Sequence, residues 1–357
     1  MSGDRILAVA TVDSSVRFAS RFISRALASG VDHLVVFVEE PRTDLEDALR
    51  DAPSVTLVRT DRAYWQGEGP DRSRDRERTN ANVALAALAE VSAAGWVFQI
   101  DEDQALCFDR EELLRLAPVA ARFPVLEAAA SRRWRSAEPQ TFKRDPSPAD
   151  LRALAALGVI ERPERGSYYR GPHAGRVGVR PGHGVRFAGV EAYAGDERLA
   201  PAEPPGMYVL NLGAWSLEDF VDRWRSFDPA RSRGGMHRGE HLGTAVHTLL
   251  RHPALGEEDR SRLLAELFDR LLADDIDTLA DFGLLGGRPD ALPVPPRPLP
   301  AADLRGLEEA LADLFSMAKE PFGDTSEASS EAEEDEADET GAAWDAGDND
   351  DEPEVDE

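Results

Sequence analysis

Three consecutive acidic residues, Asp101, Glu102 and Asp103, follow directly after an apolar segment, residues 95–100. The apolar segment predicts a buried strand, and open α/β sheets bind their ligands at the carboxyl edge of such strands. There the carboxylates of Asp101 and Asp103 can converge on one hard divalent cation. Mg²⁺ or Mn²⁺ held in this way keeps several waters and takes further oxygens from a substrate phosphate. The triplet therefore predicts a metal site, and a polar strand end that begins an ordinary loop is the alternative.

A second short pattern indicates different chemistry. His237, Glu240 and His241 match the H-x-x-E-H sequence of zinc peptidases, in which both histidines bind zinc and the glutamate activates water. Gly239 weakens the helix that must aim both histidines, and the third ligand would have to be a downstream acid such as Glu257. A zinc peptidase is therefore a remote alternative, and a capped helix start would explain the same residues.

The elements that must position these residues alternate between strand and helix patterns in the first hundred residues. Apolar runs predict strands, and an amphipathic stretch closed by Gly30 predicts a long helix. The expected strands are residues 6–11, 33–38, 55–58 and 95–100, and the expected helices are residues 14–29, a short one from about residue 43, and 82–92. This alternation predicts a mostly parallel sheet covered by helices.

The rest of the chain divides by composition. Residues 170–193 combine Gly, Arg, Val and aromatic residues with turn signals, which predicts β-hairpins. Ser216 can cap a helix, and helices then dominate to residue 285. Residues 293–300 form a stiff Pro-rich spacer before a last helix. We expect an α/β domain over residues 1–225, a helical extension over 226–292, the linker and helix over 293–322, and a disordered acidic tail over 323–357.

Charge and composition exclude several classes of protein. Residues 320–357 contain 18 acidic residues and no Lys or Arg, so only −9 of the formal net charge of −27 belongs to the rest of the chain. No block of basic and aromatic residues suggests nucleic-acid binding, and no apolar run approaches the roughly 20 residues that span a bilayer. The single cysteine, Cys107, excludes an internal disulfide and a multi-cysteine zinc site. We therefore expect a soluble cytoplasmic protein without a signal peptide.

The acidic tail is compatible with two roles. A polyanion of this kind commonly serves only to keep a protein soluble. Alternatively, it covers the Arg-rich loop at residues 62–78, or docks a basic protein partner, with Trp344 as a small apolar anchor. Either of these interactions would weaken as salt screens the charges.

Several segments, in the same order, resemble the GT-A glycosyltransferases. The resemblance is to a family-2-like branch marked by Trp-x-x-x-x-Asp-x-Asp-Glu at a strand end, matched here by Trp96, Asp101 and Asp103. Further similar segments are residues 28–33, 38–44, 78–82, 175–181 and 210–220. The resemblance covers roughly residues 5–225. It implies the GT-A fold, with a mostly parallel sheet flanked by helices, to which this chain adds a C-terminal helical extension.

The resemblance also implies an activity. Such enzymes move a sugar from a nucleotide sugar, commonly UDP-linked, to a hydroxyl of a glycan or another acceptor, usually with inversion. Asp101 and Asp103 would hold Mn²⁺ or Mg²⁺ against the diphosphate, so that Asp101 also contacts the donor. Glu39 would bind the uracil or ribose, and Arg78 and Asn82 would reach the same part of the nucleotide. A helix-start acid and a solvated helix face are the structural alternatives for these three residues.

Further residues complete the expected site. Arg176 and Arg180 are four apart on a predicted strand, so they share a face and could bind phosphate. Glu191 is the first candidate for the catalytic base and Asp196 the second, although either could be a turn acid. Asn211 falls where a family histidine completes the metal shell, and its carbonyl oxygen could replace that histidine.

Departures from the family pattern leave a second hypothesis open. The early Asn-Glu pair of the family is replaced near Asp13 and Ser14, and a family lysine by Arg176, which keeps the charge but not the geometry. Two family histidines fall on Asn211 and Glu191. A catalytically degenerate GT-A-fold protein that binds partners through its acidic tail would tolerate all of these changes.

Overall fold

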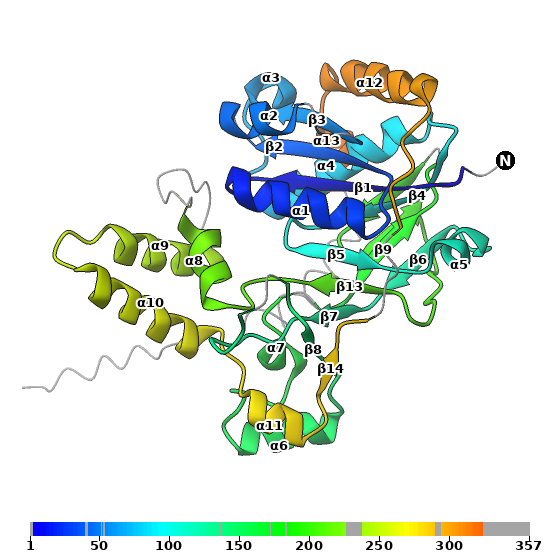
Figure 1. Ribbon diagram of the computed structural model, residues 1–357. Coiled ribbons are helices and arrows are strands. Elements are labelled where there is room, and N and C mark those ends of the chain that lie inside the picture. The colour runs from blue at the N-terminus through cyan, green and yellow to red at the C-terminus, as the bar shows by residue number, and fades with distance from the viewer. Residues whose placement is uncertain are drawn as a thin grey trace, which may run out of the picture.

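A computed structural model describes residues 3–39, 42–50, 52, 54–135, 138–171, 173–182, 184–225, 238–289 and 294–323. The central sheet has six strands in the order β3-β2-β1-β4-β9-β6 (Figure 1). The strands from β3 to β4 run parallel, and β9 is antiparallel to both of its neighbours. They are β1 (Arg5–Val12), β2 (His33–Glu39), β3 (Val55–Thr60), β4 (Ala94–Gln99), β6 (Ala120–Phe123) and β9 (Arg176–Val179). The protein is therefore α/β with a mostly parallel mixed sheet flanked by helices, which confirms the expected class at this level.

Alternate residues of the parallel strands face two separate hydrophobic cores. In β1, Ile6 and Ala8 belong to the core shared with α1 (Val16–Ala28), and Leu7 and Val9 belong to the core shared with α4 (Ser73–Leu88). Successive side chains of a strand point to opposite faces, so a strand that is covered on both must be apolar throughout. The apolar runs near the N-terminus are the direct consequence.

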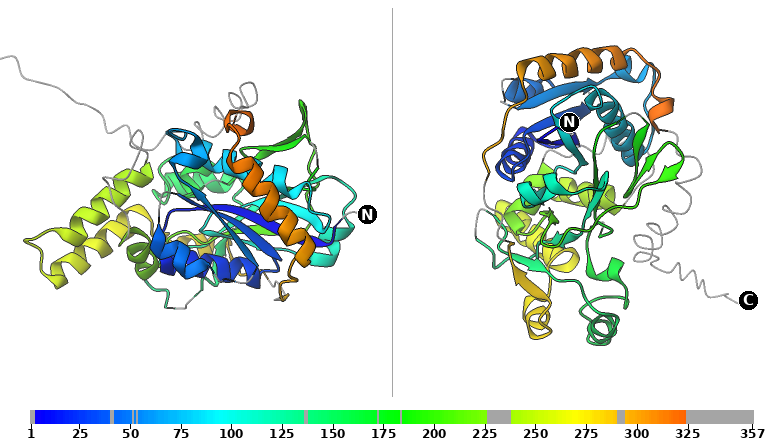
Figure 2. Two further views of the ribbon diagram at one scale, coloured as in Figure 1. Left: turned by 90° about the horizontal axis from the view of Figure 1, so that it is seen from above. Right: turned by 90° about the vertical axis from the view of Figure 1, so that its right-hand side faces the viewer.

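The helix α12 (Ala301–Phe315) lies along the face covered by α4 and completes that core (Figure 2). Leu299, Leu307 and Leu311 are buried there, and α13 (Glu320–Gly323) also contacts α4. The described part of the Pro-rich segment, expected to be a spacer, is bonded to the sheet domain, because the Arg297 N–H donates to Asp32 Oδ1 at 2.6 Å. Residues 294–323 therefore pack onto the sheet. The acidic tail beyond residue 323, with its proposed anchor and basic partner, lies outside the described residues.

A smaller three-stranded sheet, β5-β13-β7, lies beside the central one (Figure 1). Strand β5 (Gln104–Cys107) begins directly after the acidic triplet, and β13 (Tyr208–Asn211) pairs antiparallel with β5 and parallel with β7 (Val125–Glu127). In this register Gln104 and Glu127 lie on either side of Asn211. The second sheet thus brings three polar residues next to the triplet.

The other elements surround these two sheets. Helices α8 (Leu217–Arg225), α9 (Arg238–Arg251) and α10 (Glu257–Leu271) form a helical arm that projects to one side (Figure 1). The predicted β-hairpin region forms β10 (Val185–Ala188), β11 (Glu191–Ala194) and β12 (Glu197–Arg198). The remaining elements are α2 (Thr43–Leu49), α3 (Arg62–Trp65), α5 (Arg110–Arg115), β8 (Thr141–Lys143), α6 (Pro148–Ala156), α7 (Arg165–Tyr168), α11 (Ile276–Asp281) and β14 (Leu285–Gly287). Within the described ranges, none of the helices has the length and apolar composition needed to cross a membrane.

Asp32, which is fully buried, joins several distant segments. Its carboxylate forms a two-point ion pair with Arg110, at 2.7 and 2.8 Å, and accepts hydrogen bonds from the N–H groups of Ile6 and Arg297. Arg110 also donates to the carbonyl oxygen of Gly30 at 2.5 Å. Such a set is stabilising only when it is complete, because removal of one partner leaves the other charge buried and unpaired.

Replacing Arg110 with Met should lower the free energy of unfolding by about 3–5 kcal/mol, since Asp32 is left without its counter-charge. Urea denaturation followed by circular dichroism measures the change. The double variant D32N/R110M removes both charges and should recover much of the loss. A cost for R110M of under about 1 kcal/mol, the range of an exposed ion pair, would contradict this account.

His33 in β2 makes the stability of the protein depend on pH. Its ring is buried and shares a 2.8 Å hydrogen bond with Thr56, and burial lowers its pKa from 6.5 to about 4. Between pH 6.5 and 4, the unfolded chain binds a proton at this histidine and the folded chain does not. The contribution of His33 to the free energy of unfolding is therefore fully present above pH 6.5 and is lost as the pH falls towards 4. His33→Gln should flatten this part of the curve by up to about 1.4 kcal/mol per pH unit. Urea midpoints across this pH range test it, and an unchanged slope would refute it.

Candidate functional site

A cleft of about 480 Å³ lies at the carboxyl edge of the parallel strands. Because β2 and β4 flank β1, the strand order reverses there, which is the usual position of ligands in open α/β sheets. Residues from the ends of β1, β2, β4, β7 and β13 and from α4 and α8 line it. The polar lining includes Asp13, Glu39, Glu77, Gln99, Asp101, Glu102, Asp103, Gln104, Glu127, Arg170, Asn211 and Arg223. Trp224, Leu242 and Leu272 add an apolar part from the helical arm.

Asp101 is held in one orientation by two neighbours. Its N–H donates to Gln104 Oε1, and Gln104 Nε2 donates to Asp101 Oδ2, both at 3.1 Å. Arg176 in β9 donates to the same Asp101 Oδ2 and, through Nε, to Gln104 Oε1 at 3.1 Å. Arg176, which we predicted to bind phosphate, thus contacts Asp101, the first aspartate of the triplet.

Asp103 and Asn211 are brought together at the end of the small sheet. Asn211 Oδ1 accepts the N–H of Gly213 at 3.1 Å, and Asp103 accepts the N–H of Leu212 at 2.7 Å through its carbonyl oxygen. A Cβ atom on Gly213 would lie 3.3 Å from Asn211 Oδ1 and 3.5 Å from Asp103 Oδ2, so both oxygens converge on this glycine. Asp103 Oδ2 also accepts a 2.6 Å hydrogen bond from Arg223 Nη1 in α8.

The crowding of carboxylates changes their protonation. Burial raises the pKa of Glu102 to about 7, and burial together with the charge of Asp101 raises the pKa of Glu77 to about 8. Burial also raises the pKa of Asp101, although the charge of Arg176 opposes this effect. Glu102 Oε2 is buried without a hydrogen-bond partner. The cleft therefore holds more acid than its own arginines neutralise, which favours a cationic ligand.

Glu39 lines the cleft as expected, from the end of β2. Its carboxylate forms a two-point ion pair with Arg76 of α4, at 2.7 and 3.1 Å. The charge of Glu39 is therefore already neutralised by Arg76 when a ligand contacts Glu39.

Four residues expected to bind the nucleotide sugar do not line the cleft, namely Arg176, which reaches it only through Asp101, and Arg78, Asn82 and Arg180. Asn82 accepts the N–H of Phe187 at 2.7 Å and donates to the carbonyl oxygens of Phe187 and Phe322, so it joins α4 to β10 and α13. Arg180 donates to backbone carbonyl oxygens and stacks on Trp96, 4.7 Å from the ring centroid. Arg78 pairs with Asp75, three residues earlier on α4, at 2.9 Å.

The two candidate bases also lie elsewhere. Glu191 is in β11, where Arg122 and Arg198 donate to its carboxylate at 2.6–2.8 Å. Asp196 is an exposed residue in the turn between β11 and β12. Neither residue is part of the cleft lining. In the H-x-x-E-H pattern, His237 and the side chains up to His241 lie outside the described residues, so the zinc peptidase stays a prediction.

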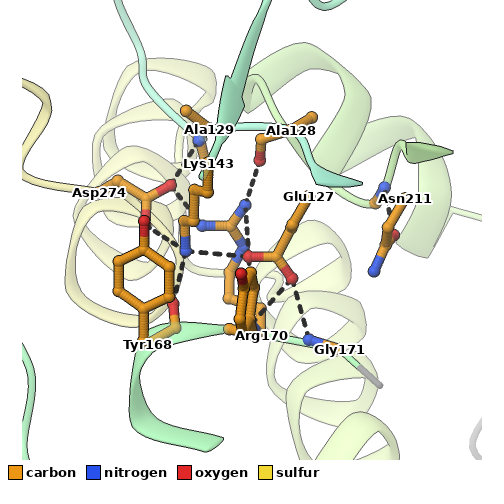
Figure 3. Close-up of polar contacts among 12 residues, drawn as sticks. Glu127, Ala128, Ala129, Lys143, Tyr168, Arg170, Gly171, Asn211 and Asp274 are labelled. Carbon is orange, nitrogen blue, oxygen red and sulfur yellow. Dashed lines mark hydrogen bonds and ion pairs between the residues drawn. The ribbon is translucent and has the colours of Figure 1, made fainter. Parts of the chain in front are cut away.

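Sequence reasoning missed a buried ionic network behind Glu127 (Figure 3). Lys143 Nζ lies 2.9 Å from Glu127 Oε1 and 2.8 Å from Asp274 Oδ1, and it donates to the carbonyl oxygen of Tyr168 at 2.7 Å. Arg170 Nη1 pairs with Asp274 Oδ2 at 2.6 Å, and Arg170 Nη2 lies 3.4 Å from Glu127 Oε1. Burial acts to raise the pKa of Asp274, but the charges of Arg170 and Lys143 outweigh it and hold that pKa below its usual value.

The network shapes the part of the cleft that faces the small sheet. The N–H groups of Arg170 and Gly171 donate to Glu127 Oε2 at 2.9 and 3.0 Å (Figure 3). A Cβ atom on Gly171 would lie 2.6 Å from Asn211 Nδ2, so a larger residue here would require the Asn211 side chain to move. One signal could have pointed to the network: only two of the 41 basic residues are lysines, and Lys143 is one of them.

The donors in the cleft fit a hard divalent cation that is bound together with an anionic ligand. Within the described ranges, no group of three or more His, Cys, Asp or Glu side chains is arranged to hold a metal ion. Mg²⁺ and similar ions are commonly bound through one or two carboxylates, waters and substrate phosphates, without such a cage. Asp101 and Asp103 supply oxygen donors of this type, and the unpartnered oxygen of Glu102 is a third acid in the same cleft.

Comparisons with known proteins include two distant structural likenesses. No family model and no curated protein matches the chain. Rv0371c from Mycobacterium tuberculosis H37Rv aligns with a TM-score of 0.22 and 14% identity, over 37% of this chain and 69% of that one. The inositol-1-phosphate CTP transferase from T. maritima aligns with a TM-score of 0.22 and 13% identity, over 41% of this chain and 62% of that one. Likenesses at this TM-score carry no argument, so the function must be argued from the cleft.

Proposed function

We propose that this protein is a GT-A-type glycosyltransferase that moves a sugar from a nucleotide diphosphate sugar, UDP-linked, to an acceptor hydroxyl. The observation that carries the proposal is the gathering of strand-end acids from β1, β2 and β4 in one cleft at the point of strand reversal. The order of the sequence motifs that resemble this family agrees with that placement.

The cleft residues have separate roles in this proposal. Asp101 and Asp103 hold Mn²⁺ or Mg²⁺, and a cation there would neutralise the diphosphate leaving group. Arg176 is the proposed contact for a phosphate oxygen and reaches the cleft through Asp101, since it is not itself part of the cleft lining. Glu39, at the end of β2, is the proposed contact for the ribose or base. The N–H groups of Arg170 and Gly171 orient Glu127, which lines the cleft beside the small sheet.

The reaction needs one displacement. The acceptor oxygen forms a bond to the anomeric carbon, and the bond from that carbon to the diphosphate oxygen breaks, with its electron pair leaving on the diphosphate. The proton of the acceptor hydroxyl passes to a carboxylate that lines the cleft. Glu191 and Asp196 do not carry this step in the proposal, because neither lines the cleft.

A second candidate function has its own supporting observation. Arg176 and Arg223 pair with both aspartates of the triplet, and these guanidinium groups already balance part of the acid charge. A degenerate relative that keeps the fold and binds partners could retain such pairs as a purely structural feature. It would bind neither a divalent cation nor a nucleotide diphosphate in this cleft.

The intact chain should be stabilised by UDP only when Mn²⁺ is also present, by about 2.7 kcal/mol at a ligand concentration 100 times the Kd. Thermal unfolding with each ligand alone and with both measures this. The double variant D101N/D103N should lose the joint effect and should no longer release UDP from UDP-sugars. The matched control D47N/D259N changes the charge equally at exposed sites outside the cleft and should behave as wild type. Failure of UDP with Mn²⁺ to stabilise the wild type would favour the degenerate protein.

A further inference from the structure

Arg223 is a cation from the helical arm that reaches into the acidic cleft. It lies on α8, lines the cleft, and donates through Nη1 to Asp103 Oδ2 at 2.6 Å. Burial alone would lower the pKa of its guanidinium, but the charge of Asp103 outweighs burial and raises that pKa, so the group stays charged. No sequence motif singled it out, and it belongs to a helix far along the chain from the triplet.

The helix that carries Arg223 is fixed to the sheet domain. Arg17 pairs with Asp222 at 2.5 Å, and Arg21 pairs with the buried Asp219, so two ion pairs join α1 to α8. The guanidinium carbon of Arg223 lies 5.8 Å from the centroid of the Phe18 ring. The two ion pairs therefore set the backbone position of Arg223 independently of its bond to Asp103.

We propose that Arg223 is a diphosphate-binding residue that occupies the cation position on Asp103 while the cleft is empty. Its Nη1 bonds to Asp103 Oδ2, an oxygen that the proposed function assigns to a divalent cation, so the two positive groups compete for one carboxylate. When a cation binds there, Arg223 turns to the diphosphate of the nucleotide sugar. Guanidinium binds phosphate oxygens through two parallel N–H groups, so this anion is a suitable second partner. The inference rests on the proposed function and extends it to the leaving group.

The proposed movement of Arg223 from Asp103 to the diphosphate can be distinguished from a purely structural role. The two predict opposite changes in the Mn²⁺ affinity of the variant Arg223→Gln. If Arg223 only supported the site, its loss would weaken the binding of every ligand. If it competes with the cation and binds the diphosphate, Arg223→Gln should bind Mn²⁺ more tightly and UDP less tightly. Calorimetry on the full chain measures both affinities, first with Mn²⁺ alone and then with UDP at saturating Mn²⁺.

For Arg223→Gln we expect a several-fold gain in Mn²⁺ affinity and a loss of about 10-fold to 100-fold in UDP affinity, typical of a hydrogen bond to a charged group. Arg223→Lys keeps the charge without the two parallel N–H groups, so its affinities for Mn²⁺ and for UDP should lie between those of the wild type and those of Arg223→Gln. Arg225→Gln is the matched control, since Arg225 is on the same helix, is 65% exposed and pairs with Asp222 outside the cleft. It should change neither affinity. Thermal unfolding of each variant establishes that it is folded.

Two results would overturn the inference, and they are distinguishable. A wild type that binds UDP with Mn²⁺, together with an Arg223→Gln variant of unchanged UDP affinity or reduced Mn²⁺ affinity, removes the role of Arg223 alone. A wild type that binds no UDP at any Mn²⁺ concentration removes the proposed function, and the diphosphate role with it. Should Arg223→Gln fail to fold, Arg223→Lys still decides the matter, because equal UDP affinity in that variant contradicts a two-pronged contact.

Discussion

The concentration of acid at one edge of the sheet is the constraint on which the site depends. Parallel strands end on the same side, so Glu39 and the Asp101–Asp103 triplet are forced into one cleft of limited volume. Carboxylates in such a place must be paired, protonated or bound to a cation. Pairing is present, because Arg76, Arg176 and Arg223 each pair with an acid. Protonation is favoured at Glu77 and Glu102, whose pKa values are raised. A bound cation is the third possibility.

Acidic residues beside the small sheet are neutralised by a network of ion pairs within the protein. Glu127 is buried and the side chain of Asp274 is 12% exposed, and Lys143 and Arg170 lie between these two acids, so the four charges alternate. The compact ammonium of Lys143 meets two carboxylates and a carbonyl oxygen within 2.9 Å. Lysine suits such a position because it offers three donors from a single point, whereas the planar guanidinium of arginine needs more room. The other lysine, Lys319, likewise donates to three carbonyl oxygens.

Local patterns predicted the elements well and the site only partly. The apolar runs of β1 and β2, the cap of α1 at Gly30 with its φ of 100°, and the Ser216 start of α8 depend on neighbouring residues, so the sequence alone indicates them. Helix α4 begins at Ser73, about nine residues before its predicted start, because its first turns are polar and carry no hydrophobic period. Asp103 and Asn211, both expected in the metal site, have side-chain oxygens that converge on Gly213.

Several residues expected at the site make their contacts with distant parts of the chain instead. Asn82 holds β10 and α13, and Arg180 stacks on Trp96, so both perform structural tasks that no local pattern distinguishes from ligand binding. Arg223 and Lys143 were missed for the same reason, since their partners lie 120 residues away for Arg223 and on several elements for Lys143. Spacing predicts which residues share a strand end, but only the packing of α8 and the small sheet decides which charges meet there.

The internal ion pairs also restrict what the cleft can bind well. A bare cation must displace Arg223 from Asp103, and a bare diphosphate must approach several carboxylates. A ligand that carries both charges avoids both costs, because its cation replaces the arginine while its phosphates replace the aspartate. The Asp–Arg pairs thus favour a cation and a diphosphate bound together over either one alone. The donor in the proposed function, a nucleotide diphosphate sugar with its divalent cation, carries this pair of charges, whereas a neutral sugar or a free metal ion does not.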